Sequence, residues 1–269
     1  MRSDRQDDDG GNNENQKSGV GNMRVTLLVL FSSICFVPLA DAWQENESVQ
    51  TETPVTVQPV SRLEEDWWAE RHEEKLQAKQ QMESVDLVLI GDSITHSWET
   101  TGQQVWKKSF PDVATLNLGF SGDRTEHVLW RFANGQIDDI EPKAVMLLIG
   151  TNNTGHHLHD PADIAAGIKA IIEDLNTRLP NTQILLLAVF PYDQDPQSPR
   201  RKNNEAVNVL IAELHDGERV HYLDICEKFF DEDGEMTKEI TPDFLHLSPA
   251  GYQIWADAVK PRLMELLEE

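Results

Sequence analysis

The chain has 269 residues, of which 23 are Lys or Arg, 47 are Asp or Glu and 39% are hydrophobic, and its formal net charge is −24. This length fits one ordinary domain with extensions, and it can bury a core without disulfides or metal ions as supports. The negative charge argues against nucleic acids and anionic membranes as partners, because phosphate contacts need Lys or Arg. Two cysteines, Cys35 and Cys226, exclude a disulfide-rich scaffold and a four-cysteine zinc site.

The N-terminal part of the sequence changes character twice. Residues 1–22 are polar and nearly free of apolar side chains, so we expect a disordered or over-extended N-terminus. Residues 23–42 contain a basic residue, an apolar run over 25–40 and an A-x-A pattern at 40–42. This order predicts a signal peptide, with Met23 as the true start. The run is shorter than the roughly 20 residues of a membrane span, and an uncleaved N-terminal anchor is the alternative.

Cleavage after residue 42 would leave Cys226 as the lone thiol of an exported protein, and we expect it to be buried rather than nucleophilic. Residues 43–60 are polar, contain two prolines and lack periodicity, which predicts a linker. The remaining residues, 61–269, form the predicted domain.

Apolar runs and helical patterns alternate along this domain. Ser61 and Glu64 match a capping box and predict an amphipathic helix over 61–82. Buried parallel strands are predicted because several apolar runs lack polar alternation; these runs are 86–91, 114–119, 144–150, 183–190 and 220–225. Helices are predicted near 124–133, 161–179 and 200–215 and from Ser248 to Leu267. Five strands alternating with helices indicate one α/β domain with helices on both faces of the sheet.

A serine follows the first predicted strand, in the run Gly91-Asp92-Ser93. A serine at a strand-to-helix turn exposes its hydroxyl near main-chain N–H groups that favour a developing anion. Ser93 is therefore a candidate nucleophile. The alternative is a helix-capping serine, and the G-x-S-x-G elbow of other hydrolases is absent because position 95 is Thr.

The ends of the next two strands carry hydrogen-bond donors. Gly119 and Gly122 allow a tight turn after the second strand, and Asn152 follows the third. A main-chain N–H and an Asn side chain are donors suited to an oxyanion. Each feature alone is also compatible with an ordinary turn.

Near the C-terminus, Asp243 and His246 lie three residues apart. One turn of chain would let the carboxylate orient the imidazole, which could then act as a general base. The pair is a weak signal by itself. The signal becomes strong in combination, because Ser93, Gly122, Asn152 and His246 follow successive strands in this order.

These residues lie in the segments GDSITHSW, NLGFSGDRTEHVLWR, GTNNTGHH and DFLHLSPAGY. With these segments the chain resembles the SGNH or GDSL hydrolase superfamily, and within it the family of brain-type platelet-activating factor acetylhydrolase catalytic subunits. The resemblance runs from about Asp66 to Leu267. It implies a flavodoxin-like three-layer α/β/α sandwich with a five-stranded parallel sheet, and serine esterase activity without a metal or other cofactor.

Carried over onto this sequence, the resemblance implies that Ser93 is the nucleophile, His246 the general base and acid, and Asp243 its orienting partner. It also implies an oxyanion hole formed by the N–H groups of Ser93 and Gly122 and by the side chain of Asn152. The expected mechanism is acylation of Ser93, release of the alcohol and hydrolysis of the acyl-enzyme.

The predicted export and the acidity depart from the intracellular relatives and disfavour a phospholipid surface. Many exported members of the superfamily deacetylate carbohydrates, so the resemblance implies an exported (periplasmic or secreted) acetylesterase that acts on short acyl esters of carbohydrates or small molecules. A lipid acetylhydrolase or lysophospholipase is the alternative. A homodimer is a further expectation, and a non-catalytic binding module is the rival from another class.

Three histidines, His156, His157 and His159, follow the third block. Their H-H-x-H spacing matches no standard zinc pattern, so we expect them to line the mouth of the site or to contact solvent rather than to bind metal. His96 is expected either to pack or to approach the substrate, and His127 to have a structural role.

Overall fold

A computed structural model describes residues 53–268. The chain divides into two units, Met1–Val49 and Gln50–Glu269, and all described residues belong to the second. The predicted disordered N-terminus, the signal-peptide pattern and Cys35 lie outside the described residues. Within residues 53–268, no helix is both long enough and apolar enough to cross a membrane.

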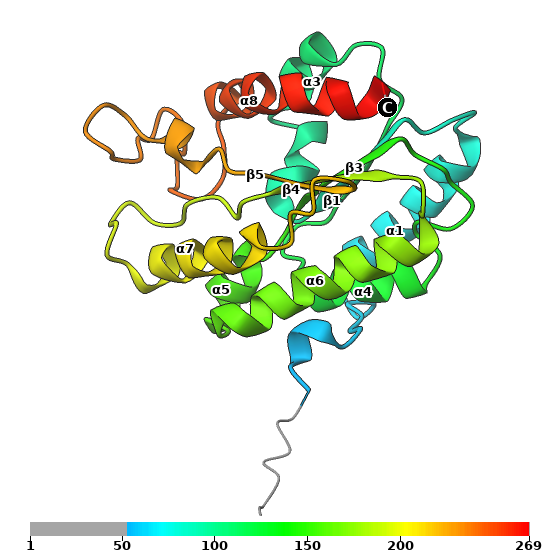
Figure 1. The fold of residues 1–269 in the computed structure, drawn as a ribbon, viewed down its shortest axis with the longest axis horizontal. Helices are drawn as coiled ribbons and strands as arrows, with labels where there is room; N and C mark the ends of the chain where they lie inside the picture. The colour runs from blue at the N-terminus through cyan, green and yellow to red at the C-terminus, as the bar shows by residue number, and fades with distance from the viewer. Residues whose placement is uncertain (1–52, 269) are drawn as a thin grey trace, which may run out of the picture. The chain divides into compact units, whose positions relative to one another are not determined.

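Five parallel strands form one sheet in this unit, in the order β2-β1-β3-β4-β5 (Figure 1). The strands are β1 Leu87–Gly91, β2 Thr115–Gly119, β3 Ala144–Leu148, β4 Gln183–Leu187 and β5 Val220–Leu223. Each lies inside a strand predicted from the sequence. The strand order is that of flavodoxin-like sheets, so the predicted three-layer α/β/α sandwich with a five-stranded parallel sheet is confirmed.

Both faces of the sheet are covered by helices, which explains the uninterrupted apolar strands. In β1, Val88 and Ile90 pack into one core and Leu87 and Leu89 into the other. The first core takes its helical residues mainly from α4 Thr125–Ala133, α6 Pro161–Arg178 and α7 Pro199–Ala212, and the second takes them mainly from α8 Pro249–Glu268. Figure 1 shows α8 and α3 (Gln103–Ser109) on one side of the sheet and α4 to α7 on the other.

Polar caps followed by proline determine where three helices begin. The side chains of Asp160 and Ser198 accept hydrogen bonds from the first turns of α6 and α7, and each of these helices has proline as its first residue. Ser248 accepts a bond from the Gly251 N–H in the first turn of α8. The predicted start at Ser248-Pro249 is therefore confirmed.

The first long helix, α1, spans Asp66–Gln81 and begins later than the sequence predicted, with Glu65 as its cap residue. The Ser61–Glu64 pattern therefore does not start the helix. Instead, the guanidinium of Arg62 reaches the carboxylate of Asp123, at 2.9 Å. This distant contact holds the chain out of the helix over the residues where the capping box was expected.

The later part of the segment expected as a linker packs against the domain. Val55–Val57 form a 3₁₀ helix in which Thr56 is buried. The Thr56 hydroxyl donates to the carbonyl of Asp163 at 2.6 Å, and the Thr56 carbonyl accepts from the hydroxyl of Thr125 at 2.8 Å. These bonds attach the segment to α6 and α4.

Candidate active site

Ser93 lies directly after β1, as the first residue of the short helix α2 (Ser93–His96). The carboxylate of Asp92 caps this helix by accepting a hydrogen bond from the N–H of Ile94, at 2.9 Å. A Cβ atom at Gly91 would lie 2.4 Å from the carbonyl oxygen of Leu148, so only glycine fits at this sharp exit from the sheet. The turn therefore presents the Ser93 side chain at the carboxyl edge of the sheet.

The side chain of His246 reaches Ser93 from the loop before α8. Its Nε2 atom is 2.9 Å from the Ser93 hydroxyl, and its Nδ1 atom is 2.7 Å from a carboxylate oxygen of Asp243. The other carboxylate oxygen accepts from the main-chain N–H groups of Leu245 and His246, at 3.1 and 2.7 Å. The structure therefore brings together Ser93, His246 and Asp243, the three residues that the sequence analysis assigned to the catalytic triad.

Electrostatics keep the orienting carboxylate ionised. Partial burial raises the pKa of Asp243, but hydrogen bonds from the His246 ring and from main-chain N–H groups outweigh it and hold the pKa below its usual value. An ionised Asp243 assigns the proton of the neutral ring to Nδ1 and leaves Nε2 as the acceptor for the Ser93 hydroxyl.

The loop after β2 and the helix after β3 meet beside this group. Gly122 has a φ of +76°, a conformation that favours glycine. Asn152 belongs to α5 (Thr151–His157), and its side-chain amide donates to the carbonyl of Asp123 at 2.9 Å. Among the described residues, no hydrogen bond is donated by the Gly122 N–H.

This arrangement is suited to acyl transfer. A hydroxyl bonded to an imidazole, which is bonded in turn to a carboxylate, can attack a carbonyl carbon while the imidazole takes up the proton. The free amide hydrogen of Asn152 and the Gly122 N–H are donors available to the oxygen on which charge would develop.

Asp92 is fully buried, and burial raises its pKa to about 7; the nearby charge of Asp123 adds to this effect, while the Ile94 N–H and His246 oppose it. Its carboxylate caps α2 and lies next to the nucleophile. Asp92 therefore holds this turn through its bond to the Ile94 N–H.

Two further histidines have structural contacts. The Nδ1 atom of His96 is 3.0 Å from the hydroxyl of Ser121, so the helix of Ser93 is tied to the Gly122 loop. Burial, assisted by the charge of Arg71, lowers the pKa of His96 to about 4. His127 accepts a bond from the main-chain N–H of Arg124 at 3.0 Å, which confirms its structural role at the start of α4.

The three clustered histidines form a row of ring contacts, with 6.3 Å between the ring centroids of His156 and His157. His156 lies 3.4 Å from the guanidinium of Arg124, whereas His157 stacks on His159 with 5.1 Å between ring centroids. Within residues 53–268, no group of three or more His, Cys, Asp or Glu side chains is placed to hold a metal ion. His156 borders a hollow of about 310 Å³ that Gly122 also lines, which places it next to the Gly122 loop.

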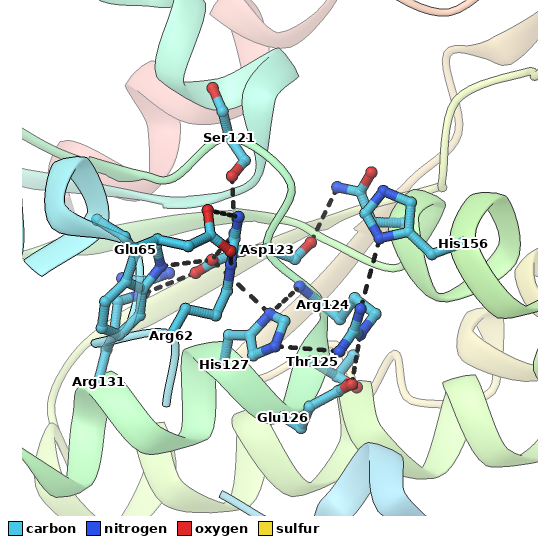
Figure 2. Close-up of polar contacts among 12 residues, drawn as sticks. Arg62, Glu65, Ser121, Asp123, Arg124, Thr125, Glu126, His127, Arg131 and His156 are labelled. Atoms are coloured by element: carbon cyan, nitrogen blue, oxygen red, sulfur yellow. Dashed lines mark hydrogen bonds and ion pairs between the residues drawn. The ribbon is translucent and has the colours of Figure 1, made fainter. Parts of the chain in front are cut away.

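A buried ionic cluster behind the Gly122 loop was not visible in the sequence (Figure 2). Asp123 has no exposed surface, and its carboxylate accepts bonds from Arg131 at 2.9 Å and from the indole N–H of Trp68 at 2.8 Å. Arg131 belongs to α4, which follows Asp123 closely in the sequence, whereas Trp68 belongs to α1 and is distant from Asp123 along the chain. The side chain of Asp123 is therefore fixed from behind while its carbonyl holds Asn152.

Asn153 stabilises the same region from α5. Its side-chain oxygen accepts from the N–H of Thr125 at 3.1 Å, and its amide donates to the carboxylate of Glu126 at 3.0 Å. The sequence motifs singled out its neighbour Asn152 and gave no indication of this structural role for Asn153.

Cys226 lies on the β4–β5 side of the sheet, away from Ser93 at the end of β1. Its thiol is 3.5 Å from the carbonyl of Val189, and burial raises its pKa. A thiol with a raised pKa is a poor nucleophile, so the expected non-catalytic role agrees with its surroundings, although the residue is only partly buried.

The sequence profile of the GDSL-like Lipase/Acylhydrolase family matches residues 89–254. This range includes Ser93, Gly122, Asn152 and the Asp243–His246 pair. The chain belongs to the GDSL-like lipase/acylhydrolase family and is thus an ester hydrolase by class.

The relatives include named acetylhydrolases. The chain is 35% identical to human platelet-activating factor acetylhydrolase IB subunit alpha1 over 184 residues, which are 68% of this chain and 78% of the human protein. It is 37% identical to the alpha1 subunit from Bos taurus over 185 residues, which are 68% and 77% of the two chains. The resemblance stated from the sequence motifs is therefore confirmed.

Solved structures share the fold. A GDSL-like lipase from Bacteroides thetaiotaomicron has a TM-score of 0.60 and 16% identity, with 72% of this chain and 97% of that chain covered. An acetylxylan esterase from Geobacillus stearothermophilus has a TM-score of 0.54 and 17% identity, with 67% and 93% covered. At such identities the comparison supports the architecture alone.

Proposed function

We propose that this protein is an exported serine esterase that removes short acyl groups, above all acetyl, from carbohydrate esters. The observation that carries the proposal is the chain of hydrogen bonds from Ser93 through His246 to Asp243, at 2.9 and 2.7 Å. Gly122 and Asn152 lie on the two loops next to this chain.

In the acylation step, the Ser93 hydroxyl attacks the carbonyl carbon of the ester and His246 Nε2 accepts its proton. The negative charge on the carbonyl oxygen is stabilised by the N–H groups of Ser93 and Gly122 and by the Asn152 side chain. The tetrahedral intermediate collapses when the alcohol leaves with the proton from His246. An acyl group then remains on Ser93.

In the deacylation step, His246 takes a proton from water, and the resulting nucleophile attacks the acyl-enzyme. The same donors stabilise the second oxyanion. Ser93 regains its proton as the carboxylic acid leaves. Asp243 remains ionised throughout, because its hydrogen bonds hold its pKa low.

The choice of acetyl rests on the relatives. The named homologues are acetylhydrolases. The choice of a carbohydrate rests on the net charge of −24, which disfavours an anionic lipid surface, and on the signal-peptide pattern of residues 23–42.

A second candidate is a lipid acetylhydrolase that acts on esters like platelet-activating factor. The 35% identity to the human alpha1 subunit favours it. The two candidates share the same chemistry at Ser93 and differ only in the alcohol that leaves.

The proposal also covers signal-peptide cleavage, nucleic-acid binding and the oligomeric state. We expect the mature protein to begin after residue 42, to bind no nucleic acid and to form a homodimer. Mass spectrometry of the protein recovered from the periplasm or medium would test the cleavage, and light scattering would test the dimer. An intact N-terminus or a monomer would contradict the respective statement.

The catalytic assignment is tested with 4-nitrophenyl acetate. Wild-type protein should hydrolyse it and Ser93→Ala should not, while a fluorophosphonate probe should label only the wild type. An unlabelled, inactive wild type would instead indicate a non-catalytic binding module.

The substrate is tested by comparing the rates of hydrolysis of two substrate classes. One class is acetylated xylan and acetylated sugars, and the other is a phospholipid that carries an acetyl ester. The proposal expects a kcat/KM at least tenfold higher on the carbohydrate esters. The reverse order would identify the lipid acetylhydrolase.

A further inference from the structure

The oxyanion loop, defined as residues Phe120–Arg124 between β2 and α4, carries Gly122 at its centre. Its position relative to Ser93 is fixed by a bond from the Phe120 N–H to the Gly91 carbonyl at 3.0 Å. His96 contacts Ser121 from the side of the nucleophile helix, at 3.0 Å. These contacts hold the side of the loop that faces Ser93.

Arg62 holds the loop from the opposite side. One of its terminal nitrogens donates to the carbonyl of Ser121 at 2.8 Å and to the carboxylate of Asp123 at 2.9 Å. The two residues that flank Gly122 are thus bonded to the same guanidinium nitrogen. Figure 2 shows this guanidinium between Glu65 and the loop.

The guanidinium also lies against Gly122 itself. A Cβ atom built on Gly122 would be 3.2 Å from both terminal nitrogens of Arg62. The side chain of Arg62 is only 13% exposed, and Asp123 is completely buried. Arg62 therefore forms the rear wall of the loop at the residue that would bind the oxyanion.

Arg62 is held in place independently of the loop. Its Nε and second terminal nitrogen each donate to the carboxylate of Glu65, both at 2.9 Å. Val60, two residues before Arg62, donates its N–H to the carbonyl of Glu126 at 3.0 Å. A planar guanidinium with a two-point bond to a carboxylate has a defined orientation, so it can impose a position on the loop.

The loop in turn positions the second oxyanion donor. The Asp123 carbonyl accepts the bond from the Asn152 amide at 2.9 Å, and the Asp123 side chain is the acceptor for Arg62. A shift of Asp123 would move its carbonyl and with it the Asn152 side chain. Both Gly122 and Asn152 thus depend on the anchoring of one short loop.

We infer that Arg62 is a positioning residue of the oxyanion hole: it acts through Ser121 and Asp123 to set the Gly122 N–H and the Asn152 amide for the transition state. This inference rests on the proposed function. Arg62 precedes the first strand and lies outside the matched family range of 89–254. Trp68 and Arg131 share the Asp123 carboxylate with Arg62, but neither donates to the main chain of the loop.

The test is a double-mutant cycle on hydrolysis of 4-nitrophenyl acetate, with Arg62→Met, Asn152→Ala and the double variant. Acylation and deacylation both form an oxyanion, so kcat reports on the hole whichever step is slower. A misplacement of about 1 Å can cost about 100-fold in rate. We expect Arg62→Met to lower kcat by about 10- to 100-fold and to change KM by less than about threefold.

In the Asn152→Ala background, Arg62→Met should lower kcat by a clearly smaller factor, because one of the donors it positions is already gone. Arg62→Lys, which keeps one charged donor, should recover part of kcat. Arg178→Met, which removes an exposed arginine bonded to Asp174 and Asp138, is the matched control and should keep the kcat of the wild type.

The inference would be overturned if Arg62→Met lowered kcat by the same factor in the wild type and in the Asn152→Ala variant. An unchanged kcat in a folded Arg62→Met variant would also overturn it. If Arg62→Met does not fold, the same cycle with Glu65→Gln decides, since it weakens the clamp on Arg62 and leaves the loop sequence intact. A wild type without esterase activity would refute the proposed function itself, whereas an active wild type with an insensitive Arg62 refutes only the positioning role.

Discussion

The side-chain amide of Asn152 donates one of its two hydrogens to the main-chain carbonyl of Asp123, at 2.9 Å. This bond joins the helix after β3 to the loop after β2, and it leaves the second amide hydrogen for a ligand. The two donors proposed for the oxyanion are therefore parts of one hydrogen-bonded unit.

Asn152→Ala removes one proposed oxyanion donor, and we expect kcat on 4-nitrophenyl acetate to fall by about 100- to 1000-fold. The lost bond to Asp123 should cost only about 1 kcal/mol of stability. Asn181→Ala, at an exposed position, is the matched control. If kcat of the folded variant decreases by less than about tenfold, Asn152 does not act on the transition state.

Asp243→Asn keeps the shape of the side chain and removes its charge. The neutral amide no longer assigns the His246 proton to Nδ1, and the wrong tautomer cannot accept the proton of Ser93. We expect kcat to fall by roughly 1000-fold or more. The measurement is steady-state hydrolysis of 4-nitrophenyl acetate, with the exposed Asp257→Asn as control. Activity within tenfold of the wild type would mean that another group orients His246.

Much of the fold and of the candidate site was predictable because its signals are local. Strands buried on both faces read as short apolar runs, and the functional side chains follow the ends of β1 and β3 directly. The pair Asp243 and His246 lies within one turn of chain, so its geometry depends on a few neighbouring residues. The fold then brings these local motifs together at one edge of the sheet.

The supports of the site were not predictable, because they join residues that are distant in the sequence. Arg62 and Asp123 form their ion pair between a segment expected to begin a helix and the loop after β2. The Thr56 hydroxyl reaches α6 in the same way. Composition and periodicity describe neighbours along the chain. They contain no information on which distant groups will form hydrogen bonds or ion pairs with each other.

Gly91→Ala tests the turn that presents Ser93. The new Cβ would lie 2.4 Å from the Leu148 carbonyl and 2.1 Å from the Thr95 hydroxyl, and the main-chain oxygen cannot move aside without disturbing the β1–β3 pairing. We expect a loss of about 3 kcal/mol in the free energy of unfolding, measured by urea denaturation.

The comparison variant for Gly91→Ala is Gly234→Ala. Gly234 has a φ of +78°, and a Cβ there would meet nothing within 4 Å. Its cost should be only the backbone strain, about 1 kcal/mol. Equal losses in the two variants would show that crowding at Gly91 is not what requires glycine.

Asp92→Asn should change how stability depends on pH. Burial raises the pKa of Asp92 from 3.8 to about 7, so between these values the native state keeps a proton that the unfolded state has released. The free energy of unfolding of the wild type therefore decreases as the pH rises through this interval. Asparagine cannot ionise, yet its side-chain oxygen can still accept the bond from the Ile94 N–H, so the variant lacks this contribution.

Relative to the wild type, Asp92→Asn should gain stability as the pH rises from 4 to 8, by up to about 4 kcal/mol. Urea denaturation at pH 4, 5.5, 7 and 8 measures the difference. His246 and Asp123 are the titratable groups that act on Asp92, and both remain in the variant. Asp257→Asn should give a nearly constant difference across the same range. A constant difference for Asp92→Asn as well would show that this carboxyl is ionised in the native protein at acidic pH, with its pKa close to the ordinary value.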